Sequence, residues 1–359
     1  MKNWKRWLLA ILLTLVIAFV YYYINLPALN IHSAGFWCFV ILMVFVFAIV
    51  LSFRSVWKSG HVSFGKKGLD IQKGTMGPYR YLFYLGGVLL LIFLIGSVLS
   101  SPIINAKKYQ KLMQVEERDF TADIKEVDFN TIPLLDRDSA AILGSRKMGS
   151  MVDMVSQFEV ADDYTQINVS GKPVRVTPLM YASPIKWLTN QKNGIPAYIQ
   201  IDMTTQDTEC VKLTEGIKYS ESEMFNRYIW RHIRFRYPTY IFADQIFFEI
   251  DDEGTPYWIC PVKKFNIGLF GGVTVGRVVL CNAITGECTD YQADEVPTWV
   301  DKVYQAELLM QLYDYHGMLQ HGYLNSVLGQ RDCLQTTNGY NYICLLYTSP
   351  SPRDGLLSR

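Results

Sequence analysis

The sequence predicts an α+β protein in two parts: three N-terminal transmembrane helices, followed by an extracytoplasmic antiparallel-sheet domain with packed helices. At 359 residues the chain is long enough for two domains of about 150 residues each. Its N-terminal part is mostly apolar, whereas the rest alternates short strand patterns, turns and charges. The 34 Lys and Arg nearly balance the 33 Asp and Glu, which excludes a broadly basic nucleic-acid binder.

Three uncharged apolar runs predict the membrane domain, residues 1–100. A helix needs about 20 apolar residues to cross about 30 Å of hydrocarbon. The runs 7–26, 36–53 and 81–100 contain no charged side chain. Core helices of a soluble domain rarely have such a composition over this length. We therefore expect three membrane spans with the lipid bilayer as their partner.

The loops between these runs predict their direction. Lys2, Lys5 and Arg6 precede the first run, and residues 25–35 contain no Lys or Arg. The loop 54–80 has a single acid, Asp70. Its basic residues are Arg54, Lys58, Lys66, Lys67, Lys73 and Arg80. Positive charge stays on the cytoplasmic side, so we expect this loop inside and residues 101 onward outside the cell membrane. The six cations either face anionic lipid headgroups or only set the topology.

Helix and strand patterns predict a stalk or linker at 101–130 and an α+β domain at 131–343. The expected helices are 138–147, with Asp138 as N-cap, 221–235 and 299–315. The expected strands are 165–169, 174–177, 197–201, 245–250, 257–260 and 276–280.

A weak internal repeat runs through these strands. The hexapeptide that begins at Gly194 recurs sixty residues later at Gly254, and the segment from Gly171 resembles a degenerate earlier copy. Either a duplicated module or a coincidence of turn chemistry explains the similarity.

Two segments resemble PepSY-type domains. Residues 249–259 read Glu-Ile-Asp-Asp-Glu-Gly-Thr-Pro-Tyr-Trp-Ile, and residues 277–287 read Arg-Val-Val-Leu-Cys-Asn-Ala-Ile-Thr-Gly-Glu. Asn282 replaces the usual Asp, and the insertion 265–275 is long and rich in Gly. The whole chain also resembles a family of polytopic membrane proteins of Gram-positive bacteria with an outer domain of this kind. The resemblance implies a cystatin-like helix on an antiparallel sheet, duplicated if the repeat is real, and a binding or regulatory role in the bacterial cell envelope. It supplies no catalytic residues.

Cysteines and histidines are the candidate chemical groups of the outer domain. Cys281 and Cys288 flank a turn, so their thiols could face each other at disulfide distance if the strands pair; otherwise they are packed free thiols. The chain lacks a Cys-x-x-Cys motif, and we expect no metal and no cofactor. His316 and His321 lie five residues apart, with Asp314 and His232 as possible additions. This spacing could hold a metal only across a loop, and we expect these histidines to be solvated or hydrogen-bonded.

A cluster of basic residues beside Tyr237 is a candidate partner surface, for an anionic wall polymer or for an acidic face of the same domain. It consists of Arg227, Arg231, Arg234 and Arg236.

The leading functional expectation is a non-catalytic, membrane-anchored envelope protein whose outer domain binds or regulates a protein or cell-wall partner. Exposed hairpins or a sheet edge would provide the contact by strand addition. The alternative is a membrane-bound hydrolase or thiol enzyme with part of its active region beyond the C-terminal end. A transporter is disfavoured because no ionisable residue lies within a predicted span.

The last residues are expected to be foreign to the protein. Residues 344–354 resemble the translation of a sequencing adapter, so we expect 344–359 to be an artefact and the natural chain to be truncated near Ile343. A natural Ser- and Pro-rich tail is the alternative.

Overall fold

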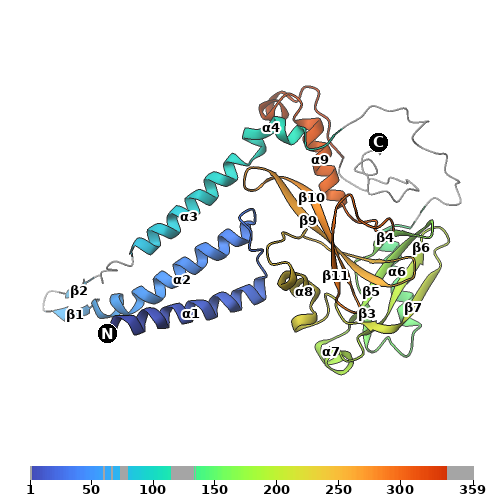
Figure 1. Ribbon diagram of the computed structural model, residues 1–359, viewed down its shortest axis with the longest axis horizontal. Helices are drawn as coiled ribbons and strands as arrows, with labels where there is room; N and C mark the ends of the chain where they lie inside the picture. The colour runs from blue at the N-terminus through green and yellow to red at the C-terminus, as the bar shows by residue number, and fades with distance from the viewer. Residues whose placement is uncertain are drawn as a thin grey trace. The chain divides into compact units, whose positions relative to one another are not determined.

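The computed structural model describes residues 2–59, 61–65, 68–72, 80–114, 133 and 135–337. The chain forms two compact units, residues 1–104 with 268–271 and residues 105–267 with 272–359. Three apolar helices precede antiparallel sheets and further helices, which confirms the predicted α+β class (Figure 1). The predicted artefact at 344–359 lies outside the described residues.

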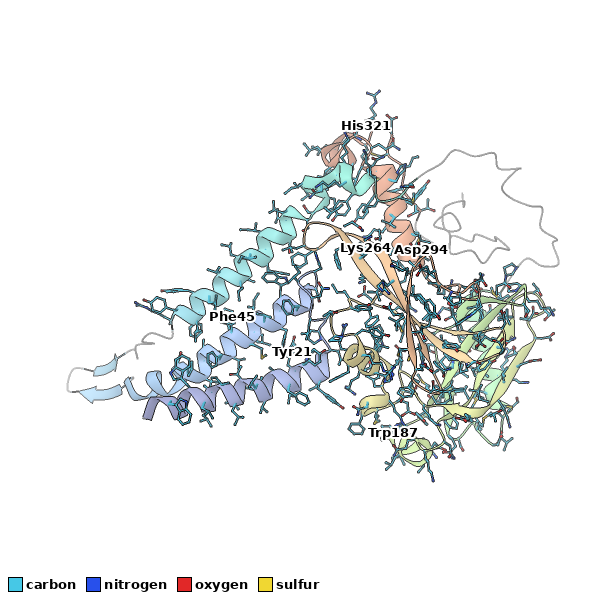
Figure 2. All side chains as sticks on the ribbon, viewed as in Figure 1. Tyr21, Phe45, Trp187, Lys264, Asp294 and His321 are labelled. Atoms are coloured by element: carbon cyan, nitrogen blue, oxygen red, sulfur yellow. The ribbon has the colours of Figure 1, made fainter. Side chains whose placement is uncertain are left out.

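The first unit contains three long helices: α1 (Lys2–Asn25), α2 (Ala34–Ser59) and α3 (Arg80–Leu99). By length and composition, Trp7–Asn25, Ala34–Ser52 and Arg80–Leu99 can each cross a membrane, which supports membrane localisation. At the α2–α3 contact, a Cβ on Gly86 would lie 2.8 Å from the ring of Phe45 (Figure 2). Glycine therefore lets the two helices approach closely.

The predicted basic loop is partly structured. α2 continues to Ser59 and so includes Arg54 and Lys58, and Arg80 is the first residue of α3. Between them, β1 (His61–Gly65) pairs antiparallel with β2 (Gly68–Gln72). The other three basic residues, Lys66, Lys67 and Lys73, lie outside the described residues. Lipid contact by this loop stays a prediction.

The second unit begins with a sheet made by the first half of the domain. After α4 (Pro102–Gln110), which falls in the predicted stalk, come α6 (Arg137–Gly149) and α7 (Pro184–Asn190). The strands are β3 (Phe158–Val160), β4 (Thr165–Val169), β5 (Lys172–Tyr181), β6 (Ile195–Asp202) and β7 (Thr208–Ile217). They are ordered β3-β5-β6-β7, and β4 also pairs with β5.

The second half of the domain forms another antiparallel sheet. Its helical elements are η3 (Phe225–Arg227), α8 (Ile229–Arg236), α9 (Ala306–Met318) and a π-turn at Asn325–Gly329. Its strands are β8 (Phe247–Ile250), β9 (Pro256–Ile267), β10 (Gly271–Asn282) and β11 (Cys288–Gln292). Their order is β11-β10-β9-β8 (Figure 1).

The two sheets repeat one topology, because β4–β7 and β8–β11 are both four-stranded antiparallel meanders. The first hairpin of each turns at a glycine of nearly equal φ, +81° at Gly171 and +82° at Gly254. In the structure, the counterpart of Gly254 is therefore Gly171, whose segment looked like the degenerate copy in the sequence. It is not Gly194, where the sequence similarity is stronger.

Hydrogen bonds of two acidic side chains explain two differences from the predicted helices. The N-cap of α6 is Asp136, not Asp138, because the Asp136 carboxylate accepts the N–H of Ser139 at 2.6 Å. The segment 221–224, predicted as helix, is a loop. There Glu223 is buried and accepts hydrogen bonds from Tyr181 and Trp187 at 2.7 and 2.8 Å.

The last helix starts later in the chain than predicted, because the buried Glu249 side chain binds the segment before it. Residues 299–305 are not helical, and α9 starts at Ala306. The two side-chain oxygens of Glu249 accept the backbone N–H groups of Asp301 and Lys302 at 2.9 and 2.8 Å. These bonds tie the segment to β8, and it packs Val300 and Val303 into a small core.

The second sheet is buried on both faces. Cys281 lies in the main core, which both sheets and α8 line, whereas the preceding Leu280 lies in the smaller core beside Val300. Successive residues of a strand point to opposite faces, so β10 is apolar at consecutive positions.

Burial of Glu249 predicts a pH-dependent stability. Burial raises its pKa to about 8, with the nearby Asp301 adding to the effect, against an ordinary 4.5. The folded chain then holds a proton that the unfolded chain loses, so stability should fall as pH rises from about 4.5 to 8. Thermal unfolding of the detergent-solubilised chain across this range measures the slope. Glu249→Gln should flatten it and the exposed Glu253→Gln should not; an unchanged slope in Glu249→Gln contradicts the assignment.

Candidate functional site: a histidine and two cysteines

The turn between β10 and β11 is fixed by one side chain. The Asn282 amide oxygen accepts the N–H groups of Ile284 and Thr285, both at 2.9 Å. The Asn282 N–H donates to the Glu287 carbonyl at 2.8 Å, which closes the turn. Asn282 thus makes the acceptor contacts that an Asp side chain makes in turns of this kind.

This turn places Cys281 directly opposite Cys288 in the β10–β11 register. Because the Asn282 N–H donates to the Glu287 carbonyl, the adjacent Cys281 and Cys288 are a non-hydrogen-bonded pair. Such pairs have Cα atoms about 4.5 Å apart, inside the range that a disulfide spans. The two residues are free thiols in the structure, and the disulfide stays a prediction.

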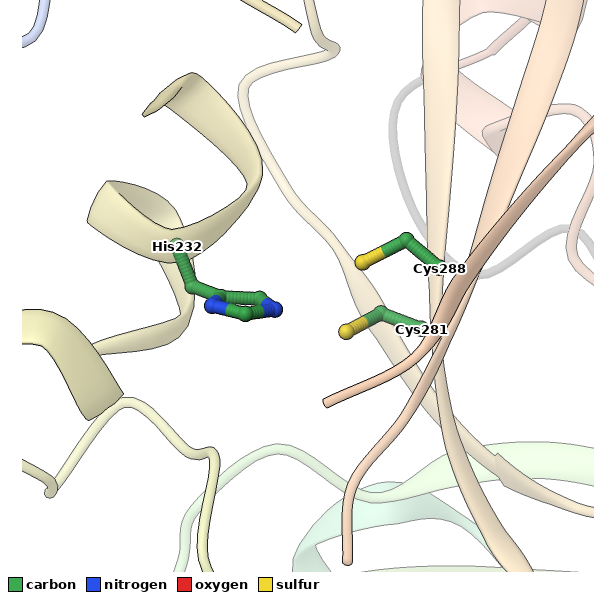
Figure 3. A group of neighbouring side chains, drawn as sticks. All are labelled: His232, Cys281 and Cys288. Atoms are coloured by element: carbon green, nitrogen blue, oxygen red, sulfur yellow. The ribbon is translucent and has the colours of Figure 1, made fainter. Parts of the chain in front are cut away.

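His232 joins the two cysteines from α8. Its Nε2 lies 2.7 Å from the Gly286 carbonyl oxygen, which can only accept, so Nε2 carries a proton. The ring also lies against Tyr219, with centroids 4.4 Å apart. The imidazole and both sulfur atoms point into one space, with potential ligand atoms within 4.8 Å of one another (Figure 3).

Gly286 is required by this packing. Its φ is +74°, and a Cβ there would lie 2.4 Å from the Tyr219 ring. A larger residue would push Tyr219 away and disturb the face on which His232 rests.

The two thiols have opposite acidities. Its interaction with the Cys281 thiol, and to a smaller extent with His232 and Arg236, lowers the Cys288 pKa to about 5. The same interaction, with burial, raises the Cys281 pKa far above its ordinary value. Burial also raises the pKa of Cys260 on β9. Of the two paired thiols, Cys288 is therefore the more acidic.

Exposure separates the two cysteines in the same way. Cys281 is fully buried, whereas Cys288 on strand β11 is half-buried. A reagent from solvent meets Cys288 first. An accessible thiolate beside a buried thiol is an arrangement suited to thiol–disulfide exchange.

The first half of the domain contains the same turn without the cysteines. Asp202 accepts the N–H groups of Thr204 and Thr205 at 2.8 and 3.0 Å, and its own N–H donates to the Asp207 carbonyl. The pair at the position of Cys281 and Cys288 is Ile201 and Thr208. The backbone arrangement therefore forms without sulfur.

The four predicted partner-binding arginines have different surroundings. Arg234 is buried and donates to the Tyr240 carbonyl. Arg227 and Arg231 donate to backbone carbonyls at 2.5 and 2.7 Å. Arg236 is exposed and contributes to the low Cys288 pKa. A partner contact by this group stays a prediction.

The other histidines lie apart from the cysteine pair. His316 Nδ1 is 3.1 Å from the Gln110 carbonyl, and His321 Nε2 is 3.1 Å from the Asp332 carboxylate. His232, which we expected beside these two histidines, lies instead beside Cys281 and Cys288. No spacing in the sequence signals that contact.

The low Cys288 pKa predicts a distinctive alkylation profile. An ordinary thiol reacts roughly 100-fold more slowly at pH 6 than at pH 8, because its thiolate fraction falls. Cys288 should change little over this range, since its pKa is about 5. Mass spectrometry of iodoacetamide-treated full chain measures the rate at each cysteine. Cys281→Ala should restore the steep profile at Cys288, and Cys210, whose pKa burial raises, is the control. Matching profiles at Cys288 and Cys210 contradict the assignment.

Comparisons with known proteins find no relative. No family model matches the chain, and no curated protein or solved structure matches it either. The three apolar helices fit a polytopic membrane protein, while the PepSY resemblance and a bacterial origin stay predictions.

Proposed function

We propose that the chain is a membrane-anchored protein whose second unit lies outside the cytoplasm and exchanges thiols for disulfides through Cys281 and Cys288. The observation that carries this proposal is the cross-strand pairing of the two cysteines beside His232. It develops the thiol-enzyme alternative that the sequence left open.

Charge distribution supports the outer location. Basic residues lie at the start of α1, before its apolar span, and in the segment 54–80, whereas residues 25–35 carry none. This pattern favours a cytoplasmic N-terminus and places residues after α3 on the opposite side. Disulfides form and persist in such compartments, in contrast to the reducing cytoplasm.

The exchange uses a disulfide of another protein or small molecule as oxidant. The Cys288 thiolate attacks one sulfur of that disulfide, forms a mixed disulfide and releases the other sulfur as a thiolate. Cys281 then loses its proton and attacks the Cys288 sulfur, which expels the second thiol. The products are a Cys281–Cys288 disulfide and two reduced thiols, and the reverse steps oxidise a dithiol partner.

Thiol trapping in membranes tests the proposal. The full chain is treated with oxidised glutathione, its remaining thiols are blocked with a membrane-impermeant reagent, and its peptides are mapped. We expect a Cys281–Cys288 disulfide that dithiothreitol reverses, a glutathione adduct on Cys288 in Cys281→Ser, and no adduct on Cys281 in Cys288→Ser. The Cys210→Ser control should behave as the parent chain.

Two results contradict the proposal. One is a chain in which both cysteines stay reduced while glutathione oxidises Cys210. The other is a Cys288 that the impermeant reagent reaches only after the membrane is opened, which places the second unit inside.

Partner binding without catalysis is the second candidate function, and a surface patch favours it. Ile185 and Leu188 of α7 and Phe225 of η3 are 72%, 62% and 63% exposed. Phe225 has a φ of +51°, which is unusual for a bulky residue and often marks functional sites. Arg227 and Arg231 lie in the same segment and could meet an anionic protein or wall polymer.

Photocrosslinking tests this second candidate. A photoreactive residue in place of Leu188 should give a specific protein or wall-polymer adduct in native membranes, and Ile185→Glu should reduce its yield. The same probe in place of Val152, which is 86% exposed, is the control. Equal adducts at the two positions, or none at Leu188, rule out a partner at this patch.

A further inference from the structure

We propose that the reduced site binds a thiophilic divalent cation, Zn²⁺ or a similar ion, through Cys281, Cys288 and His232. The ligands come from β10, β11 and α8 (Figure 3). The inference rests on the proposed function only in requiring the dithiol form of the pair.

The geometry is close to that of a tetrahedral site. Zn²⁺ bonds sulfur at about 2.3 Å and imidazole nitrogen at about 2.0–2.1 Å, which places neighbouring ligand atoms about 3.5 Å apart. The three potential ligand atoms already lie within 4.8 Å of one another. Shortening their separations by up to about 1.3 Å brings them onto one ion.

The ligand chemistry selects the class of metal. Two thiolates and an imidazole suit Zn²⁺ and other soft or borderline ions, whereas Ca²⁺ and Mg²⁺ need oxygen ligands. A divalent charge neutralises both thiolates, which matters because Cys281 is fully buried. Three protein ligands leave the fourth position of a tetrahedral ion open. Open sites of this kind hold water or a substrate.

Binding requires a defined movement of protons. The two thiols give up their protons to solvent, because only a thiolate ligates. The His232 Nε2–H donates a hydrogen bond to the Gly286 carbonyl. Coordination through Nε2, which faces the sulfur atoms, requires this proton to move to Nδ1 and the bond to Gly286 to break, whereas coordination through Nδ1 requires the ring to turn.

Packing has already oriented the imidazole. The Tyr219 ring lies 4.4 Å from the His232 ring, and Gly286 leaves the space for it. The corresponding turn in the first half of the domain has Ile201 and Thr208 in place of the two cysteines, and neither residue is a soft metal ligand. Metal binding and disulfide formation use the same sulfur atoms, so an ion bound here also protects the pair from oxidation.

Metal titration of the reduced, detergent-solubilised full chain tests the proposal. The probes are Zn²⁺ by competition with a chromophoric chelator and Cd²⁺ by thiolate-to-metal charge-transfer absorption. We expect one ion per chain. Cys281→Ser and Cys288→Ser should each weaken binding by more than the roughly 10–100-fold that outer-sphere changes cost, and His232→Gln by at least about 10-fold.

Matched variants and the oxidised chain provide the controls. Cys210→Ser and His316→Gln should bind as the parent does, and the disulfide form should not bind at this site. The proposal is wrong if the folded, reduced chain binds no ion, or if binding survives in Cys281→Ser and Cys288→Ser. Far-ultraviolet circular dichroism confirms that each variant is folded.

The two proposals can fail separately. Reversible disulfide formation without metal binding overturns only the metal site. One-to-one metal binding in a chain that glutathione never oxidises at Cys281 and Cys288 overturns only the exchange function.

Discussion

The Asn282–Glu287 turn is the constraint on which the candidate site depends. Strand pairing has a period of two, so a slip of one residue would turn every side chain of β11 to the other face and separate Cys281 from Cys288. Two backbone N–H groups held by the Asn282 amide oxygen prevent this slip. Gly286 lies in the same turn. Its carbonyl accepts a hydrogen bond from His232 Nε2, and its lack of a side chain leaves room for the Tyr219 ring. One turn therefore sets both the cysteine register and the histidine position.

The position of the site at a sheet edge explains the difference between the thiols. β10 lies inside the sheet and is covered on both faces, so Cys281 has no access to solvent. β11 is the edge strand, and Cys288 at its start is half-buried. The interaction between the two thiols is the main cause of their different pKa values; burial adds to the high value of Cys281, and His232 and Arg236 add to the low value of Cys288.

Local patterns predicted most of the architecture, and long-range contacts account for what they missed. Uncharged runs gave the three helices, and alternation located strands such as β4 to the residue. Edge strands β7 and β11 are polar and exposed in part, so their alternation was not recognised. The start of α9 depends on Glu249, about fifty residues upstream. The cysteine pair followed from its turn, whereas His232 is placed by tertiary packing of α8, which leaves no mark in local sequence.

The duplicated fold separates structural need from chemistry at the site. The Asp202 turn has the same hydrogen bonds as the Asn282 turn, yet it is flanked by Ile201 and Thr208. An apolar residue facing a small polar one is therefore enough to build this hairpin. The Asp202 turn has Gln206, at a φ of +64°, in the position that Gly286 occupies in the Asn282 turn. Gly286 is needed there only because the Tyr219 ring packs against it. The cysteines, the glycine and the histidine above them are additions to a turn that folds without them. The folding of the turn therefore does not account for their presence.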